Sequence, residues 1–435
     1  MEAIIFEPLR WMDESARVCI INSDRRPKTY FQMTGRSNAE VSCLGRPVEE
    51  LPRMLTILSP AHHIVSAMAL DRMFNVEPPP LAANMREALL QTLFLAHHLR
   101  KLYFLLSSMK EPFLDYRTRV TPETLSVIPH HMLDKVMDHL ALAQEAAEIF
   151  GGRVDHPLSA VTGGVGRFLK EPHYGRISEI ARECLDFAVE LAAFFRERVF
   201  SEKSITQEAL GRHFPPMPAL TMTDGTGSIV VRDPGDKAGF RFDSDKLFDK
   251  VGIHSEPWTY KPFAYLKEKG WNSLEADSCD GLFFVGPLAR LNDGLELRYQ
   301  RAEEERLRLI DALGPFPHFS VVAAYRSLVV ELVQGAERLT ELCVQEKLTG
   351  PAIRTIPSQM NCEAFAAVES PRGVIAHHYE TDERGIVKQI RVLDTSVANN
   401  ALRCLLVRNV VDGSKDALHN PKRIKERIET SLLPF

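Results

Sequence analysis

The chain has 435 residues, of which 45% are hydrophobic and 26% are charged, as in a globular protein with a sizeable core. Its net charge of -5 provides no basic excess of the kind that binds nucleic acids or anionic membranes. Residues 1–17 lack the charged, apolar and small-residue regions of a secretion signal, so we expect none.

The first third predicts two strands followed by helices. Strand-like segments occupy residues 18–21 and 29–33, with turn residues between them. Residues 85–106 are the most apolar stretch, but they carry several charges, whereas a membrane span needs about 20 residues nearly free of charge. We therefore predict a buried helix there. Asn84 with Glu87 three residues later resembles a capping box at its start.

A further helix is predicted over residues 176–200, where apolar residues recur at spacings of three and four and therefore share one face. This face consists of Ile180, Cys184, Phe187, Leu191 and Phe194. Core packing is the simpler interpretation of such a face, and a groove for a partner is the alternative.

The remainder predicts an irregular segment and then a return to helix. Residues 203–297 are rich in Gly, Pro and Asp and contain short strand-like pieces such as 228–232. Helices are expected over 298–345 with a break near 314–317, then a hairpin of 374–379 with 386–393, and a basic helix over 421–433.

These elements predict a mainly helical α+β fold with a long-helix core and small peripheral sheets. We expect a single domain, 1–435, made of an N-terminal sheet (1–60), a helical core (61–202), the insertion (203–297) and a second helical part with the C-terminal hairpin and helix (298–435).

The cysteines and histidines give no metal-binding spacing by themselves. Seven cysteines are scattered without any C-x-x-C pair, so we expect reduced thiols in a cytoplasmic compartment. They are Cys19, Cys43, Cys184, Cys279, Cys343, Cys362 and Cys404. His-His dipeptides occur at 62–63, 97–98, 130–131 and 377–378. Adjacent helical side chains point about 100° apart, so one dipeptide cannot close on an ion, and core or surface histidines are the simpler interpretation.

Glycine- and proline-containing turns are the other local signals. Residues 162–166 are glycine-rich but do not fit a phosphate-binding loop, so we predict a tight turn. Arg372 stands between Pro371 and Gly373, a setting that can hold a guanidinium rigidly. That charge can be aimed into a cleft or can belong to a surface turn, and composition leaves both open.

Several segments, taken in order, resemble the large subunit of nickel-iron hydrogenases, and most closely the cytoplasmic group linked to coenzyme F420, viologen or NAD(P). The matching residues are 45–53, 59–63, 155–157, 163–165, 256–260, 285–292, 369–373, 377–380 and 399–400. Each segment is a weak signal alone, but the series covers nearly the whole chain. The resemblance implies the hydrogenase large-subunit fold.

The departures from the family's pattern concern its metal ligands. The family holds nickel and iron through an N-terminal R-x-C-G-x-C and a C-terminal D-P-C-x-x-C motif. In the first region this sequence has Leu55 and Leu58 at the degenerate metal-site positions, and the sequence ends at Phe435 where the second would begin. Thiolate is the soft ligand that such a metal pair requires, and leucine has no lone pair to offer. The resemblance therefore implies no metal centre in this chain.

Three further positions are expected to mark a vestigial active-site region. The family's proton-relay glutamate aligns with Asp13, and its magnesium-binding glutamate aligns with Glu40. Arg372 matches the arginine that lies over the iron-bound diatomic ligands in the family.

The resemblance leaves three functions open. The first is a non-catalytic component of a cytoplasmic electron-transfer complex, a structural subunit that packs against an iron-sulfur small-subunit-like protein and does not activate hydrogen. Iron-sulfur clusters, with flavin as a further candidate, are then expected in the partner subunits rather than in this chain. The second is a scaffold that carries metal units during hydrogenase maturation, through an exposed thiolate such as Cys43 or Cys362. The third is an active hydrogenase large subunit.

Overall fold

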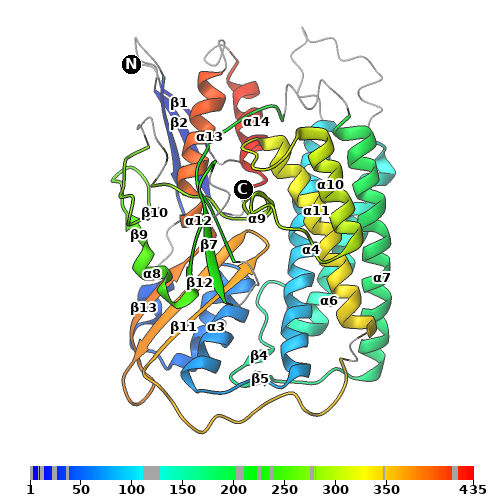
Figure 1. The fold of residues 1–435 in the computed structure, drawn as a ribbon, viewed down its shortest axis with the longest axis vertical. Helices are drawn as coiled ribbons and strands as arrows, with labels where there is room; N and C mark the ends of the chain where they lie inside the picture. Colours follow the sequence, from blue (N-terminus) through cyan, green and yellow to red (C-terminus); the bar gives the residue numbers. More distant parts are fainter. Residues whose placement is uncertain are drawn as a thin grey trace.

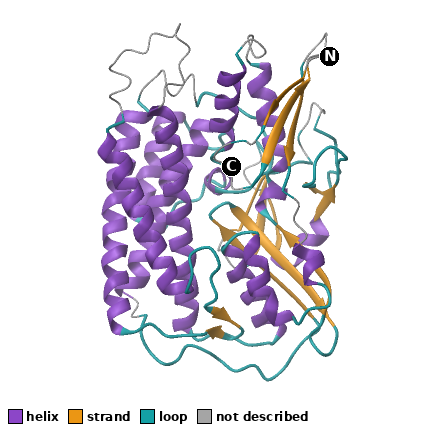
Figure 2. Cartoon of the chain, turned by 180° about the vertical axis from the view of Figure 1, so that it is seen from behind, coloured by secondary structure: helices purple, strands orange, loops and turns teal. Residues whose placement is uncertain are grey.

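Long helices gather on one side of the molecule and most of the strands on the other (Figures 1 and 2). This computed structural model describes residues 3–7, 9, 14–21, 27–35, 39–110, 128–201, 210–222, 227–235, 239–274, 279, 281–345, 348–413 and 420–435. None of the described helices has a stretch long and apolar enough to cross a membrane.

Five long helices form the bundle: α4 (Pro80–Lys110), α6 (His130–Gly151), α7 (Glu171–Phe194), α10 (Gln300–Leu313) and α11 (Val321–Thr340). Helix α11 packs against α4, α7 and α10, and α6 packs against α4 and α7. The apolar face predicted on α7 points into the core, since Ile180, Cys184, Phe187 and Leu191 are buried. Helices α7 and α11 each continue into a π-helical turn, η3 (Phe195–Val199) and η6 (Glu341–Gln345).

The strands form small antiparallel sheets rather than one large sheet. The three-stranded sheets are β1 (Ala3–Phe6), β2 (Ala16–Ile21) and β3 (Lys28–Met33); β6 (Ala219–Met222), β7 (Ser228–Arg232) and β8 (Phe240–Asp243); and β11 (Glu363–Ser370), β12 (Gly373–Thr381) and β13 (Val387–Leu393). The strand pairs are β4 (Ala160–Val161) with β5 (Gly164–Val165), and β9 (Val251–His254) with β10 (Phe263–Leu266). A second apolar core lies between the β6–β8 and β11–β13 sheets.

Shorter helices connect the bundle and the sheets. They are α1 (Ala39–Cys43), α2 (Leu51–Met54), α3 (Ala61–Met73), α8 (Leu247–Lys250), α9 (Pro287–Asn292), α12 (Thr395–Ala398), α13 (Asn400–Asp412) and α14 (Pro421–Leu432), with the 3-10 turns η1 (Val48–Glu50), η2 (Leu55–Ile57) and η5 (Ser244–Lys246). Helix α3 packs against β11 and β12, and α13 packs against β3 and α14. The C-terminal Phe435 is buried, and Arg403 donates a hydrogen bond to its backbone oxygen at 2.7 Å.

The mainly helical α+β fold class is confirmed, and most predicted elements occur within a few residues of their expected places. The capping box at Asn84 is wrong, because α4 begins one turn earlier at Pro80. Glu87 instead binds the Arg338 guanidinium on α11, with Oε1 at 2.6 Å from Nε. The predicted hairpin is present as β12 and β13, but a third strand, β11, extends it to a sheet.

One largely buried arginine joins the two sides of the molecule. Arg290 on α9 donates through Nη2 to Glu331 of α11 at 2.6 Å and through Nη1 to Glu369 of β11 at 2.5 Å. Both glutamates are buried. Although burial alone would raise it, the charge of Arg290 holds the pKa of Glu331 below its usual range.

Replacing Arg290 by methionine should destabilise the fold by about 3–5 kcal/mol, because two buried carboxylates lose their counter-charge. The measurement is urea unfolding followed by circular dichroism. Arg298→Met is the matched control: that side chain is 68% exposed, and loss of its pair with Glu341 should cost less than about 1 kcal/mol. Equal effects of the two substitutions would contradict this role of Arg290.

Candidate functional site

The turn after α2 contains Leu55 and Leu58, the two residues that the resemblance assigns to metal-ligand positions. Leu55 begins η2 and is fully buried, and Leu58 packs, partly buried, against the main core. Between them, Ile57 is 75% exposed. Leucine side chains have no donor atom, so this turn offers neither a thiolate nor an imidazole to a metal.

A chain of buried polar groups begins one turn further along, at the start of α3. His62 Nδ1 lies 2.8 Å from His377 Nε2 on β12, and the two rings are stacked. His377 Nδ1 lies 2.6 Å from the Tyr379 hydroxyl, which lies 2.8 Å from Ser66 Oγ. We call His62, His377, Tyr379 and Ser66 the buried polar chain. Burial, assisted by nearby His62, holds the pKa of His377 well below its usual range, so this ring is neutral.

Charged residues extend the buried polar chain toward the surface. His62 Nε2 lies 3.6 Å from Asp394 Oδ1, and Lys261 Nζ lies 3.5 Å from Asp394 Oδ2 and 3.1 Å from Glu14 Oε2. Glu14 Oε1 is in turn 3.8 Å from Arg372 Nη2. Burial opposes ionisation of Asp394, but its contact with His62 and the charge of Lys261 hold the pKa of that carboxyl well below its usual range.

Glu40 and Cys43 both lie on the short helix α1. The backbone N–H of Val392 donates to Glu40 Oε1 at 2.7 Å, so the glutamate fixes α1 to β13. Cys43 is fully buried, and desolvation together with Glu40 raises the pKa of its thiol to about 11. At neutral pH this thiol is protonated and is therefore a poor metal ligand.

In the part of the chain that the structure describes, one group has the residue types and spacing of a cation site: Glu363, His378 and Glu380. Both ring nitrogens of its histidine already have partners. Glu363 Oε1 lies 2.7 Å from His378 Nε2, and the Arg391 guanidinium donates to His378 Nδ1 at 3.0 Å. A cation would have to displace these contacts, so the group is better explained as cross-strand pairing within the sheet.

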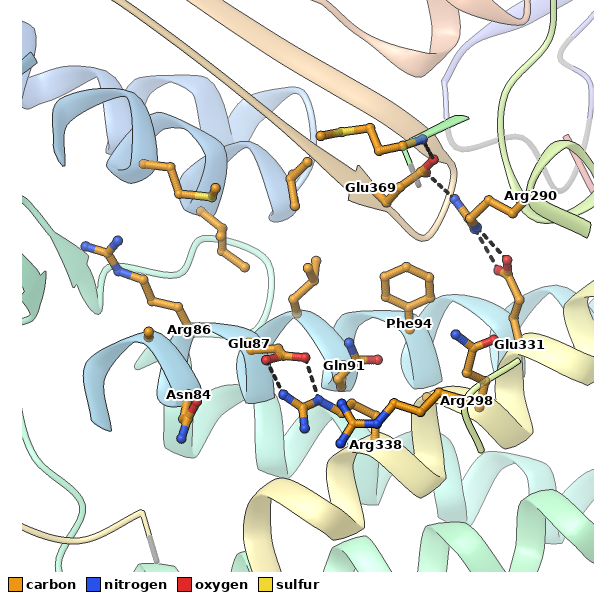
Figure 3. Close-up of a pocket in the computed structure, with 18 of the residues that line it drawn as sticks. Asn84, Arg86, Glu87, Gln91, Phe94, Arg290, Arg298, Glu331, Arg338 and Glu369 are labelled. Atoms are coloured by element: carbon orange, nitrogen blue, oxygen red, sulfur yellow. Dashed lines mark hydrogen bonds and ion pairs between the residues drawn. The ribbon is translucent and has the colours of Figure 1, made fainter. Parts of the chain in front are cut away.

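A large cleft lies apart from these residues, between the bundle and the β11 edge (Figure 3). Its volume is about 990 Å³, at the upper end for small-molecule sites. Figure 3 shows Arg290 bridging Glu369 and Glu331 at one end and the Glu87–Arg338 pair along one wall. We call this space the interhelical cleft.

Comparisons with known proteins point to one family. The iron-sulfur subunit of the F420-non-reducing hydrogenase of Archaeoglobus profundus is 25% identical, over 92% of this chain and 86% of that protein. The vhu subunit of the F420-non-reducing hydrogenase of Methanocaldococcus jannaschii is 26% identical, over 92% of this chain and 96% of that protein. The crystal structure of an NAD+-reducing NiFe hydrogenase in the H2-reduced state shares the fold, with a TM-score of 0.84 and 23% identity, covering 100% of this chain and 97% of that one.

The chain has the fold of nickel-iron hydrogenase large subunits and is similar in sequence to hydrogenase subunits over nearly its whole length. No family model matches it. Ni-Fe-Se hydrogenase from D. vulgaris Hildenborough also has this large-subunit fold, with a TM-score of 0.74 at 14% identity, covering 99% of this chain and 98% of that one.

Within this hydrogenase large-subunit fold, the predicted site residues come together only in part. Asp13 lies outside the described residues, and its neighbour Glu14 is the carboxylate that faces Arg372. Arg372 is 13% exposed, so it faces the interior rather than forming a surface turn. Glu40 instead accepts a hydrogen bond from the Val392 backbone and so fixes α1 to β13.

Sequence reasoning missed most of the buried polar chain. His62 and His377 were noted as members of dipeptides and of the matching segments 59–63 and 377–380, but 315 positions separate them, so no local spacing could pair them. Lys261 and Asp394 carried no signal at all. The one local signal was the position of His62, which follows Leu58 closely and lies at the start of α3.

His63 has a separate structural role. Its Nδ1–H donates to the Pro52 carbonyl and its Nε2 accepts from the Ala160 N–H, both at 2.9 Å. Desolvation, opposed by the bond to Pro52, lowers the pKa of His63 to about 4, so the folded protein holds this ring neutral.

This shift makes stability depend on pH. The unfolded chain protonates His63 near pH 6.5 and the folded chain only near 4, so the contribution of His63 is complete above pH 6.5 and is lost as pH falls toward 4. The loss at pH 4 is about 3 kcal/mol. His63→Gln should therefore show a flatter fall in unfolding midpoint between pH 7.5 and 5 than the unmodified protein.

His131→Gln is the control, because His131 is exposed at the start of α6. It should leave the slope unchanged. Parallel pH profiles for His63→Gln and the unmodified protein would refute the assignment of His63 as a buried neutral ring.

Proposed function

We propose that the chain is a non-catalytic large-subunit-like component of a cytoplasmic electron-transfer complex. In this complex it packs against an iron-sulfur small-subunit-like protein and does not activate hydrogen itself. The proposal rests on Leu55 and Leu58, which the resemblance assigns to the positions of the family's first cysteine pair and which the structure places in the turn η2 and just after it.

The chemistry of the available donors supports this proposal. A nickel-iron centre needs soft thiolate ligands, and no residue elsewhere can replace a missing first set of ligands. The nearest cysteine along the chain, Cys43, is buried, and its thiol pKa is raised to about 11, chiefly by desolvation. The residues around Arg372 are instead held by contacts among Glu14, Lys261 and Asp394.

The surface beside the altered motif supports a role in assembly. Ile57 projects into solvent at 75% exposure, directly between the two leucines, and an exposed large apolar side chain of this kind suits an interface core. Several relatives carry names of hydrogenase subunits, such as the NAD-reducing hydrogenase HoxS subunit beta of Cupriavidus necator. Their naming supports a multi-subunit assembly for this chain as well.

The carrier alternative depends on an exposed thiolate. Cys43 does not meet that requirement because it is buried, whereas Cys362 is exposed next to β11. Because Cys362 meets the requirement for an exposed thiol, the carrier function is the second candidate. The two candidates differ in their stable partners: maturation chaperones for a carrier, and iron-sulfur or flavin subunits for an electron-transfer component.

Metal analysis of the native complex tests the first candidate. We expect nickel far below one atom per chain by mass spectrometry, iron only in amounts that the partner's clusters explain, and no hydrogen-dependent reduction of a viologen dye. Dye reduction by an artificial electron donor serves as the control that the partner subunits are intact. Stoichiometric nickel or robust hydrogen uptake would establish the third candidate, an active hydrogenase.

Substitution of the exposed isoleucine tests the proposed interface. Ile57→Asp should lower the amount of iron-sulfur partner that co-purifies with the full chain at least about tenfold, because a charge would be buried at the interface core. Ile253→Asp is the matched control, since Ile253 is 52% exposed on β9, away from the motif. Retention of the partner by both variants would exclude Ile57 from the interface.

A further inference from the structure

Both walls of the interhelical cleft combine apolar and polar side chains. One wall comes from α3, β6 and β11, and it includes Met68, Met222 and Val368 beside Asp71, Arg72 and Glu369. The other, which we call the polar wall, comes from α4 and α11 and is mainly polar. Residues 84 to 94 of α4 line the cleft, which is about 15 Å of helix at the usual rise per residue. The cleft therefore offers apolar and hydrogen-bonding side chains along an extended stretch of helix.

The charges that line the cleft are largely neutralised by one another. Glu87 and Arg338 form a two-pronged pair, as Figure 3 shows, and Arg290 is bound by two glutamates. At the far end, Arg86 is paired with buried Asp71. A ligand of high charge would have to break these pairs, so the cleft favours an uncharged one.

Two carboxamides on the polar wall remain available. Gln91 of α4 and Gln334 of α11 both line the cleft, and neither has a hydrogen bond to another of the described residues. Gly335 of α11 lies beside Gln91, since a Cβ on it would meet Gln91 Oε1 at an ordinary contact distance of 3.5 Å. Each carboxamide offers both donors and an acceptor, so together they can match a ligand edge that both donates and accepts.

Aromatic-binding side chains flank these amides. Phe94 projects into the cleft in Figure 3, with the Arg290 guanidinium 5.5 Å from its ring centroid. Met68 and Met222 supply sulfur atoms on the opposite wall, and thioethers contact aromatic rings favourably. Aromatic and thioether groups on either side of free amides are suited to a flat heteroaromatic ring.

We propose that the interhelical cleft is a binding site for an uncharged, flat heterocycle of two or three fused rings that carries an amide-like edge. Gln91 and Gln334 bind that edge, while Phe94, Met68 and Met222 hold the ring faces and rim. The site is separate from the buried polar chain and from Leu55 and Leu58, so it does not depend on the function proposed above.

Titration calorimetry with the purified full chain tests this site, with riboflavin, adenosine and menadione as the three probes. Riboflavin and adenosine offer donor-and-acceptor edges, whereas menadione only accepts hydrogen bonds. We expect saturable one-to-one binding of at least one of the first two, at least about tenfold tighter than menadione, because each unmatched carboxamide donor or acceptor weakens binding.

Three variants locate the binding. Gln91→Leu with Gln334→Leu should weaken it at least about tenfold, and Met68→Trp should weaken it because the larger indole takes space next to the bound ring. Gln144→Leu is the matched control, because Gln144 is a half-buried glutamine on neighbouring α6 outside the cleft. Circular dichroism of each variant establishes that the fold is retained.

Three results would overturn the proposal. The first is that neither riboflavin nor adenosine binds saturably with a dissociation constant below about 1 mM. The second is that menadione binds as tightly as either of them. The third is that the doubly substituted variant and the control variant bind equally well. Loss of binding in Gln144→Leu as well would place the ligand elsewhere.

Discussion

The architecture depends on one guanidinium that meets carboxylates from both sides of the molecule. Arg290 contacts Glu331 of the bundle and Glu369 of the sheet, and it also donates to the carbonyls of Ser370 and Pro371. The same side chain therefore sets the turn that carries Arg372 and closes one end of the interhelical cleft. Because buried charges cost several kcal/mol each unless they are paired, loss of this arginine would weaken the contact between the two sides.

The region around Arg372 balances its own charges. Glu14 and Asp394 supply two carboxylates, Lys261 and Arg372 supply two cations, and the neutral His377 ring lies beyond them. The two carboxylates and two cations therefore balance in number, and each lies within 4 Å of a group of opposite charge.

The sequence predicted what depends on local pattern and missed what depends on distant contacts. The α7 face was predictable because Ile180, Cys184 and Phe187 repeat at helical spacing. The start of α4 was not, because Glu87 forms a tertiary pair with Arg338 instead of a local cap. The assignment of Leu55 and Leu58 to metal-site positions stays a prediction from motif spacing. The contact of His62 with His377 could not be predicted, because it arises only when β12 packs on α3.

Gly335 has a consequence for the interhelical cleft. A glycine inside a helix costs about 1 kcal/mol relative to alanine, yet here it sits where α11 meets Gln91 and Phe94 of α4. Alanine would fit at ordinary contact distance, whereas a larger side chain would have to displace the flexible end of Gln91 and would crowd Phe94. The size of the residue at this position therefore bears directly on how much of the cleft between α4 and α11 stays open.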